Sequence, residues 1–403
     1  MKDTTVAVIG GGVVGAAVLY SLAHRAADAT LLEADSGLAY AASGTNSGVL
    51  HTGFDSTPGE LETELILRAG QQREHVLDVL GIPVLRCGAE LRPRGAGDHQ
   101  TIATLADNAH RNGVSVQVRE DDGALVIPRE WVTDPVAYTH VLADAAGRAG
   151  AEVRTEAAVE GIDRGRDGLT LHLAGGEPVT CRAAVNCAGL HADDIARLVG
   201  DDSFDIYPRK GEFFVFELAE GATLDHILLP VPTKRTKGVL VFPTLDGKVV
   251  AGPTAVDQHD KRDWSVRPDA AREVLDKAVA QLPALEGLQP IAAYAGLRPA
   301  GRNTNYVIGP SGVCPQLINV AAIRSTGVTA SLGIGAYVSD LLASLGIRLA
   351  PQRDPDPAPP RRHAARFDGA WWQRTARRYA GEQGAAAPTD VQILVAPTPP
   401  RRR

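Results

Sequence analysis

The chain has 403 residues, of which 44% are hydrophobic and 22% are charged, as in an ordinary globular protein with room for two domains. Its net charge is −7, and ten arginines against five acidic residues in 351–403 leave the rest of the chain acidic, which argues against a nucleic-acid-binding surface there. The four cysteines (Cys87, Cys181, Cys187 and Cys314) have no CxxC spacing, so we expect no metal site and interpret them as small buried side chains.

The first 33 residues have the pattern of a dinucleotide-binding unit. A short apolar run precedes Gly10-x-Gly12-x-x-Gly15, a helical pattern follows, and a second apolar run (Ala29–Leu32) ends on Glu33. The first glycine makes a tight turn, the second admits the pyrophosphate, and the third lets the helix pack on the sheet. Glu33 is placed to hold a ribose hydroxyl. The sequence therefore predicts strand, glycine turn, helix, strand and acid around a bound dinucleotide.

The later elements alternate between helical and strand patterns. We predict a loop over 36–57, a helix that starts at Pro58, a helix at 98–112 among short strands, and a helix opened by Asp134-Pro135. Residues 159–185 predict a β-meander, 204–256 a separate sheet, 268–282 a helix, and 319–345 a strand followed by a long helix.

These patterns predict an α/β protein with a discontinuous nucleotide-binding domain. Its pieces are 1–83, 136–200 and 296–350, interrupted by a β-rich substrate domain made of 84–135 and 201–295. From 351 to 403 the chain is rich in proline and arginine.

The C-terminal stretch allows two interpretations. Residues 361–382 predict a short helix with Phe367 and Trp371 on one face and Arg374, Arg377 and Arg378 around it. In the first interpretation, such a helix lies peripherally on an anionic membrane or on a partner. In the second, it docks on the body of the protein or the tail is partly disordered, and the composition favours this second interpretation. No secretory leader and no run of 18 apolar residues is present, so we expect a cytoplasmic protein, with the inner face of the membrane as its one alternative location.

The segment Ala42-Ser-Gly-Thr-Asn-Ser-Gly-Val-Leu-His-Thr-Gly53 resembles a motif of the D-amino-acid-oxidase (DAO) superfamily. Within it, the chain looks most like FAD-dependent glycerol-3-phosphate dehydrogenases and L-2-hydroxyglutarate oxidases. The resemblance continues in order through Asn186–Asp193, Pro208–Glu212, Val231–Thr233 with Gly238–Thr244, Gly252–Thr254, Gly296–Pro299 and Ile323–Thr329. It implies a Rossmann-type, glutathione-reductase-like FAD-binding domain with an inserted substrate domain.

The resemblance and the glycine motif together predict which residues bind FAD. These are Gly10, Gly12, Val13, Val14, Gly15, Glu33, Ala34, Ala42, Ser43, Thr45, Asn46, Ser47, Gly48, Val159, Ala188, Gly189, Arg298, Thr326, Gly327, Val328 and Thr329. Val159 is expected beside the adenine, and the helix that starts after Ser325 is expected to stabilise the anionic reduced flavin with its positive end.

Four residues are candidates for catalysis. His51 falls where the family has a histidine beside the flavin, so the resemblance implies a base that takes the hydroxyl proton; a merely hydrogen-bonded histidine is the alternative. Arg298 and Arg324 are expected to grip a carboxylate or phosphate, unless they form salt bridges or contact FAD. Lys210 is a weaker candidate for the same anionic pocket.

The resemblance implies oxidation of a secondary alcohol of a small anionic substrate, with glycerol 3-phosphate or a close analogue first. Residues 52–58 lack the adjacent tyrosines associated with hydroxyglutarate enzymes, which favours this side of the family. An L-2-hydroxy-acid enzyme, an amine oxidase of the same fold and a flavin-binding scaffold without turnover remain alternatives. The electron acceptor (oxygen, a quinone or a redox protein), the mode of FAD attachment and the oligomeric state are left open.

Overall fold

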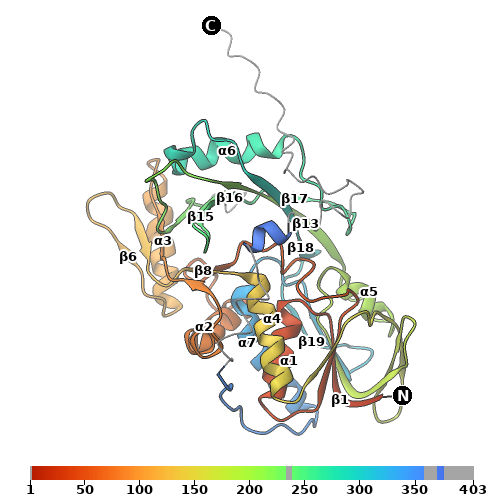
Figure 1. Ribbon diagram of the computed structural model, residues 1–403. Helices are drawn as coiled ribbons and strands as arrows, with labels where there is room; N and C mark the ends of the chain where they lie inside the picture. Colours follow the sequence, from red (N-terminus) through yellow and green to blue (C-terminus); the bar gives the residue numbers. More distant parts are fainter. Residues whose placement is uncertain (1, 233–237, 358–369, 376–403) are drawn as a thin grey trace.

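Residues 2–232, 238–357 and 370–375 are described by a computed structural model (Figure 1). Within them the chain forms two large sheets and one small one. The first large sheet lies with the packed helices α1, α4 and α7, and the second lies beneath α6 at the other end of the molecule (Figure 1).

The eight-stranded sheet has the N-terminal strand at its centre. β1 pairs in parallel with β2 and β12, and β9 and β20 extend the parallel part. β10, β11 and β12 form the antiparallel meander predicted over 159–185. The strands are β1 (Lys2–Ile9), β2 (Ala29–Leu32), β9 (Glu152–Arg154), β10 (Val159–Arg164), β11 (Leu169–Leu173), β12 (Val179–Asn186), β19 (Val307–Pro310) and β20 (Leu317–Ala321). The predicted Rossmann-type α/β arrangement is confirmed.

Helices cover one face of this sheet. α1 (Val13–Ala23) packs against α4 (Pro135–Arg148) and α7 (Gly327–Ser344), and α2 (Leu61–Leu80) packs on α7. A Cβ on Gly15 would stand 1.9 Å from the carbonyl oxygen of Gly10, so only glycine lets α1 lie this close to the turn after β1. The packing role of the third motif glycine follows directly from this contact.

The two predicted helix starts have different outcomes. Asp134 caps α4 as expected, because its carboxylate accepts hydrogen bonds from the backbone N–H groups of Val136 and Ala137, each at 2.9 Å. The prediction for α2 was wrong by three residues: the helix begins at Leu61, and Pro58 lies in the preceding turn. Gly59 has a φ of +88°, which a right-handed helix does not accommodate, so the helix starts only after it.

The nine-stranded sheet is built around the long antiparallel pair β13 and β18. Their register runs from Ile206 opposite Gly301 to Val215 opposite Ala292. The predicted boundary at residue 296 therefore lies inside β18, which belongs to this sheet along its whole length, while the other domain boundaries stay predictions. The strands are β5 (Ala89–Leu91), β6 (Gln117–Val118), β7 (Leu125–Ile127), β13 (Ile206–Phe216), β14 (Ile227–Leu229), β15 (Leu240–Pro243), β16 (Val249–Gly252), β17 (Val256–Asp257) and β18 (Ala292–Gly301).

The remaining elements flank these sheets. α6 (Ala270–Gln281) covers one face of the nine-stranded sheet, and α3 (Asp98–Arg111) packs on the other, so both predicted helices are confirmed. The small sheet consists of β3 (Val49–Leu50), β8 (Trp131–Thr133) and β4 (Val84–Leu85), in that order. α5 (Ala192–Arg197) follows the short turn Gly189–His191, and a second short turn, Pro283–Leu285, follows α6.

The described part of the C-terminal stretch is docked on the body. Residues 371–375 are helical, and Trp371 is 1% exposed, with its ring edge-on to Tyr294 at 5.4 Å. Arg374 donates to Asp134 at 2.6 Å, and the Thr375 hydroxyl donates to the carbonyl of Gly44 at 2.6 Å. Phe367, Arg377 and Arg378 lie outside the described residues. Across the described ranges, no helix combines the length and the apolar character that a bilayer span requires.

Replacement of Trp371 by alanine is expected to lower the free energy of unfolding by about 3–5 kcal/mol, because it empties a buried aromatic site. Urea denaturation followed by circular dichroism measures the change. Leu345→Ala, at a position 41% exposed, is the control and should cost less than about 0.5 kcal/mol. Equal stability of both variants would contradict the docking of this segment in solution.

Candidate active site

One cavity of about 1080 Å³ runs between the two large sheets. It begins at the end of β2, passes the start of α1 and the loop of residues 40–47, and reaches the start of α7 and one face of the nine-stranded sheet. Most of the predicted cofactor residues line it: Gly10, Gly12, Val13, Val14, Glu33, Ala34, Ala42, Ser43, Thr45, Asn46, Ser47, Val159, Ala188, Gly189, Arg298, Thr326, Gly327 and Val328. Segments far apart in the sequence thus converge on one hollow.

The end of β2 forms the first part of the cavity. The Glu33 carboxylate accepts hydrogen bonds from the backbone N–H groups of Gly11 at 2.5 Å and Asp35 at 2.8 Å, and burial raises the pKa of Glu33. Gly10 has a φ of +109°, and a Cβ there would stand 2.5 Å from the carbonyl oxygen of Cys187. The backbone beside the cavity therefore excludes side chains, as a closely approached pyrophosphate requires.

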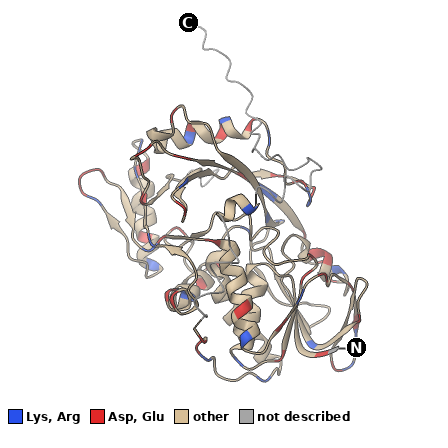
Figure 2. Ribbon diagram, viewed as in Figure 1, with Lys and Arg blue, Asp and Glu red and all other residues tan. Residues whose placement is uncertain are grey.

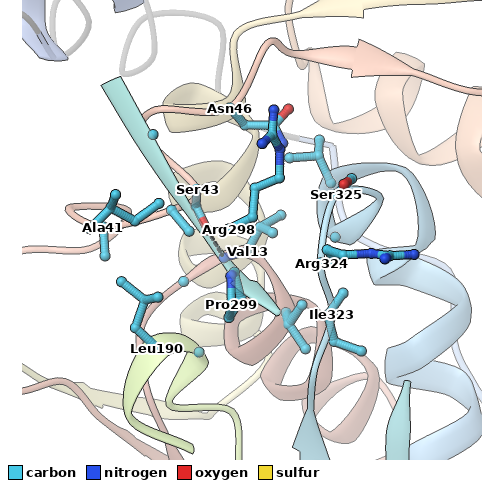
Figure 3. Close-up of a pocket in the computed structure, with 18 of the residues that line it drawn as sticks. Val13, Ala41, Ser43, Asn46, Leu190, Arg298, Pro299, Ile323, Arg324 and Ser325 are labelled. Atoms are coloured by element: carbon cyan, nitrogen blue, oxygen red, sulfur yellow. Dashed lines mark hydrogen bonds between the residues drawn. The ribbon is translucent and has the colours of Figure 1, made fainter. Parts of the chain in front are cut away.

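Two helix N-termini line the cavity. The Ser43 hydroxyl accepts a hydrogen bond from the first backbone N–H of α1, that of Val13, at 2.9 Å (Figure 3). α7 begins at Gly327, next to Ser325 and Thr326, which line the cavity. Each N-terminus carries partial positive charge, so both favour a bound anionic group.

Three predicted cofactor residues do not line the cavity. Gly15, in the first turn of α1, packs against the carbonyl of Gly10, and a Cβ on Gly48, whose φ is +75°, would stand 2.2 Å from the carbonyl oxygen of Thr133. The Thr329 hydroxyl accepts from the backbone N–H of His51 at 3.0 Å and donates to the carbonyl of Val49 at 3.2 Å. These residues lie behind the lining of the cavity, and their direct contact with FAD stays a prediction.

His51 follows β3 and lines the cavity. Its Nδ1 lies 2.8 Å from Oε2 of Glu130, and its carbonyl accepts a hydrogen bond from Nη1 of Arg73 at 2.9 Å. The Arg73 side chain is buried, which lowers its pKa, and it also donates to the carbonyl of Thr329. The backbone of His51 is therefore held on both sides, and Nδ1 of its ring contacts Glu130.

Arg298, on β18, faces the cavity half-buried. Its guanidinium donates to the backbone carbonyls of Arg209 and Thr254 at 3.3–3.4 Å, and no acidic side chain of the described residues forms an ion pair with it. Burial first, then the nearby cations Arg209 and Arg324, lower its pKa to about 10. A half-buried cation without an acidic partner among the described residues provides a site for an anion.

The two predicted arginines do not form one clamp. Arg298 extends toward Asn46, while Arg324, which is exposed, points away from it (Figure 3). Both line the same cavity, so the expectation of a shared pocket holds at the level of the cavity alone.

Lys210 is not part of this cavity, which corrects the prediction. Its ammonium group is buried and donates to Asp263 at 2.8 Å and to the carbonyl of Ser265 at 2.9 Å. Successive strand residues face opposite sides, so Arg209, its neighbour on β13, lines the cavity instead, opposite Arg298 in the register. Basic segments interrupt the largely neutral long strand pair at this point (Figure 2).

Two acidic residues of the site were missed by the sequence analysis. Glu62 lines the cavity and accepts hydrogen bonds from the hydroxyl of Thr326 at 2.6 Å and from the amide of Asn305 at 2.5 Å. Glu130 is 0% exposed and contacts His51. Neither residue lies in a recognisable sequence motif, so only the tertiary structure identifies them as residues of the site.

All four cysteines are free thiols, and Cys187 lines the cavity. Cys181, Cys187 and Cys314 are buried as expected, whereas Cys87 is half-buried. Burial raises the pKa of Cys87 to about 11 and that of Cys181 to about 12, so these thiols stay protonated. Among the described side chains, no group of three or more metal-binding residues is found.

Comparison with known sequences finds FAD-dependent oxidoreductases that are similar to this chain. The profile of a family described as "FAD dependent oxidoreductase" (DAO) matches residues 5–341. The chain is 26% identical to a glycerol 3-phosphate dehydrogenase of Caloramator mitchellensis, covering 87% of this chain and 76% of that protein. It is 28% identical to a glycerol 3-phosphate oxidase of Mycoplasma pneumoniae, over 83% and 93% of the two chains. An L-2-hydroxyglutarate dehydrogenase of Escherichia coli O17:K52:H18 is 27% identical, over 64% and 66%.

Comparison with solved structures agrees. The dithionite-reduced L-α-glycerophosphate oxidase of Mycoplasma pneumoniae with FAD bound has a TM-score of 0.82 and 25% identity, over 89% of this chain and 99% of that one. A glycine oxidase of Bacillus cereus has a TM-score of 0.73 at 22% identity, which shows the fold alone.

The cavity suits FAD on its own geometry. Glu33 and Val159 lie at one end, the side-chain-free turn at Gly10 and the start of α1 lie in the middle, and the start of α7 lies near His51 and Arg298. An acid for the ribose, a cradle for the pyrophosphate and a helix N-terminus for the flavin ring therefore follow one another along the cavity. The residues present fit this cofactor.

Proposed function

The chain belongs to the FAD-dependent oxidoreductase (DAO) family, and we propose that it oxidises the secondary alcohol of glycerol 3-phosphate, or of a close analogue, to a ketone. FAD is the cofactor of this enzyme. The named activities of the glycerol 3-phosphate dehydrogenase and oxidase among its relatives and the anion site at Arg298 support this substrate over the other substrates of the family.

His51 and Arg298 have different roles in the proposed reaction. When bound, FAD supplies an acceptor for the hydride that leaves the substrate carbon. Nε2 of His51 takes the proton of the substrate hydroxyl as the hydride leaves, so the carbonyl oxygen forms without passing through a protonated ketone. Arg298 holds the phosphate of the substrate and orients the carbinol carbon.

The observation that carries the proposal is the uncompensated charge of Arg298 in the cavity that His51 also lines. A half-buried guanidinium that donates only to carbonyls is stabilised by an anionic ligand, and a histidine in the same cavity supplies the base that an alcohol requires. An enzyme for L-2-hydroxy acids uses the same two groups and is the second candidate, supported by the L-2-hydroxyglutarate dehydrogenases among the relatives.

The test is anaerobic reduction of the bound flavin. Purified holoenzyme is mixed without oxygen with glycerol 3-phosphate, L-2-hydroxyglutarate or glycine, and the flavin band in the visible spectrum is followed. Among the three compounds, we expect glycerol 3-phosphate to bleach the flavin band with the highest second-order rate constant. Bleaching by L-2-hydroxyglutarate alone would move the substrate to hydroxy acids, bleaching by glycine alone would move it to amines, and no bleaching by any of them would favour a scaffold.

The electron acceptor is an open part of the proposal. Oxygen, a quinone and a redox protein all remain candidates, and oxygen uptake compared with reduction of a soluble quinone analogue separates the first two.

A further inference from the structure

We propose that Glu130 is a positioning residue for His51, holding its imidazole in the tautomer in which Nδ1 carries the proton and Nε2 accepts one. The inference rests on the proposed role of His51 as the base.

The small sheet brings the two residues together. β3 and β8 are antiparallel, with Val49 opposite Val132 and Leu50 opposite Trp131. His51 comes directly after β3 and Glu130 directly before β8, so they occupy the next facing positions of the same ladder. The contact between Nδ1 and Oε2, at 2.8 Å, spans 79 residues of sequence.

The Glu130 carboxylate accepts hydrogen bonds from Thr52 and contacts the imidazole of His51. Oε1 accepts from the backbone N–H of Thr52 at 2.6 Å and from its hydroxyl at 2.9 Å, while Oε2 faces the imidazole. The group is 0% exposed, so water does not compete for these positions. A carboxylate with one oxygen occupied by two donors and the other facing Nδ1 favours the ring with hydrogen on Nδ1.

The rest of His51 is held independently of Glu130. Its backbone N–H donates to the hydroxyl of Thr329, and its carbonyl accepts from Arg73. Loss of the Glu130 carboxylate therefore leaves the backbone of His51 in place and releases the choice of ring tautomer.

Glu130→Gln separates charge and tautomer from shape. The backbone N–H of Thr52 requires an acceptor, so the amide oxygen of the glutamine turns toward Thr52 and its NH₂ turns toward Nδ1. Nδ1 must then accept, the proton moves to Nε2, and Nε2 no longer takes the proton of the alcohol. Glu130→Asp keeps two acceptor oxygens and restores the required tautomer in part.

The experiment combines kinetics with a double-mutant cycle. Anaerobic stopped-flow mixing measures the limiting rate of flavin reduction and the substrate dissociation constant for the native holoenzyme, Glu130→Gln, Glu130→Asp, His51→Ala and the double variant. We expect Glu130→Gln to lose on the order of 10²-fold in the limiting rate, with the dissociation constant within about threefold of native. Glu130→Asp should recover at least about tenfold, and Glu130→Gln should cost less than about twofold when His51 is already alanine.

The matched control is Glu90→Gln. Glu90 is also buried, and its Oε1 lies 3.0 Å from Nε2 of His226, but neither residue lines the cavity. The limiting rate of flavin reduction in Glu90→Gln should stay within about threefold of the native rate. A loss in the His51→Ala background as large as in the native one, or an equal loss in Glu90→Gln, would overturn the proposal, because either result reflects general disturbance of the fold.

A second readout does not depend on the substrate. The holoenzyme is labelled with ¹⁵N-histidine and measured at mildly alkaline pH, and the His51 signals are assigned by their loss in His51→Ala. These signals should show a protonated Nδ1 and an unprotonated Nε2 in the native protein. In Glu130→Gln they should show the reverse. An unchanged tautomer in Glu130→Gln would refute the inference even if glycerol 3-phosphate reduces the flavin. A reversed tautomer in a protein whose flavin glycerol 3-phosphate does not reduce would leave the inference standing and refute the proposed substrate.

Discussion

Replacement of His51 by alanine is expected to slow flavin reduction by glycerol 3-phosphate at least ~100-fold, the usual loss when a general base is removed. The imidazole lines the cavity between the loop of residues 40–47 and the start of α7, and its backbone is fixed by Thr329 and Arg73. Because these backbone bonds survive the substitution, the loss should fall on the limiting rate of reduction and not on FAD retention. Anaerobic stopped-flow absorbance measures that rate.

The control for this prediction is His172→Ala. His172 lies on β11, exposed and paired with Asp163, and its loss should leave the rate unchanged. A His51→Ala enzyme that retains its FAD and reduces it at the native rate would dismiss the role of base. The histidine would then be a hydrogen-bonding neighbour of the cofactor, the alternative that the sequence also allowed.

Replacement of Arg298 by methionine is expected to raise the dissociation constant of glycerol 3-phosphate about 10- to 100-fold, because a charge-assisted hydrogen bond contributes about 1.5–3 kcal/mol. The same substitution should not lower the free energy of unfolding, since it removes a half-buried cation bonded only to carbonyls. Titration of flavin absorbance and urea denaturation measure the two quantities. Loss of stability without loss of affinity would indicate a structural arginine.

The pH dependence of substrate binding tests the same residue. The pKa of Arg298 is lowered to about 10, so the guanidinium is charged below that pH and loses its proton as the pH rises through it. The phosphate is already a dianion across this range, since its second pKa is about 6. The dissociation constant should therefore rise above pH ~10 in the native enzyme and stay flat in Arg298→Met.

Two further arginines serve as comparisons. Arg302→Met, at an exposed position outside the large cavity, should leave affinity unchanged. Arg324→Met should have a smaller effect than Arg298→Met, because an exposed charge is screened by water and salt. An equal loss at Arg324 would mean that the two arginines share the anion despite pointing apart in Figure 3.

The sequence by itself determined the nucleotide-binding half of the protein and a bound dinucleotide, because those features depend on short-range patterns. The resemblance to the DAO superfamily then implied that this dinucleotide is FAD. These features involve residues close in the chain or fixed by one strand–turn–helix unit: the turn at Gly10, the packing of Gly15 against that turn, the cap at Asp134 and the acid at Glu33. Small local errors came from single residues such as Gly59, whose left-handed backbone delays the start of α2.

Only the tertiary structure decided which side chains meet in the site. Because side chains alternate along β13, Lys210 faces Asp263 and Arg209 faces the cavity. Which of two neighbouring residues faces the cavity cannot be predicted in a β-rich segment until its partner strands are known. Glu130 reaches His51 because β3 and β8 pair across 79 residues, and Trp371 is buried because residues 370–375 pack on the nine-stranded sheet. Such contacts depend on long-range pairing, which no local pattern of residues encodes.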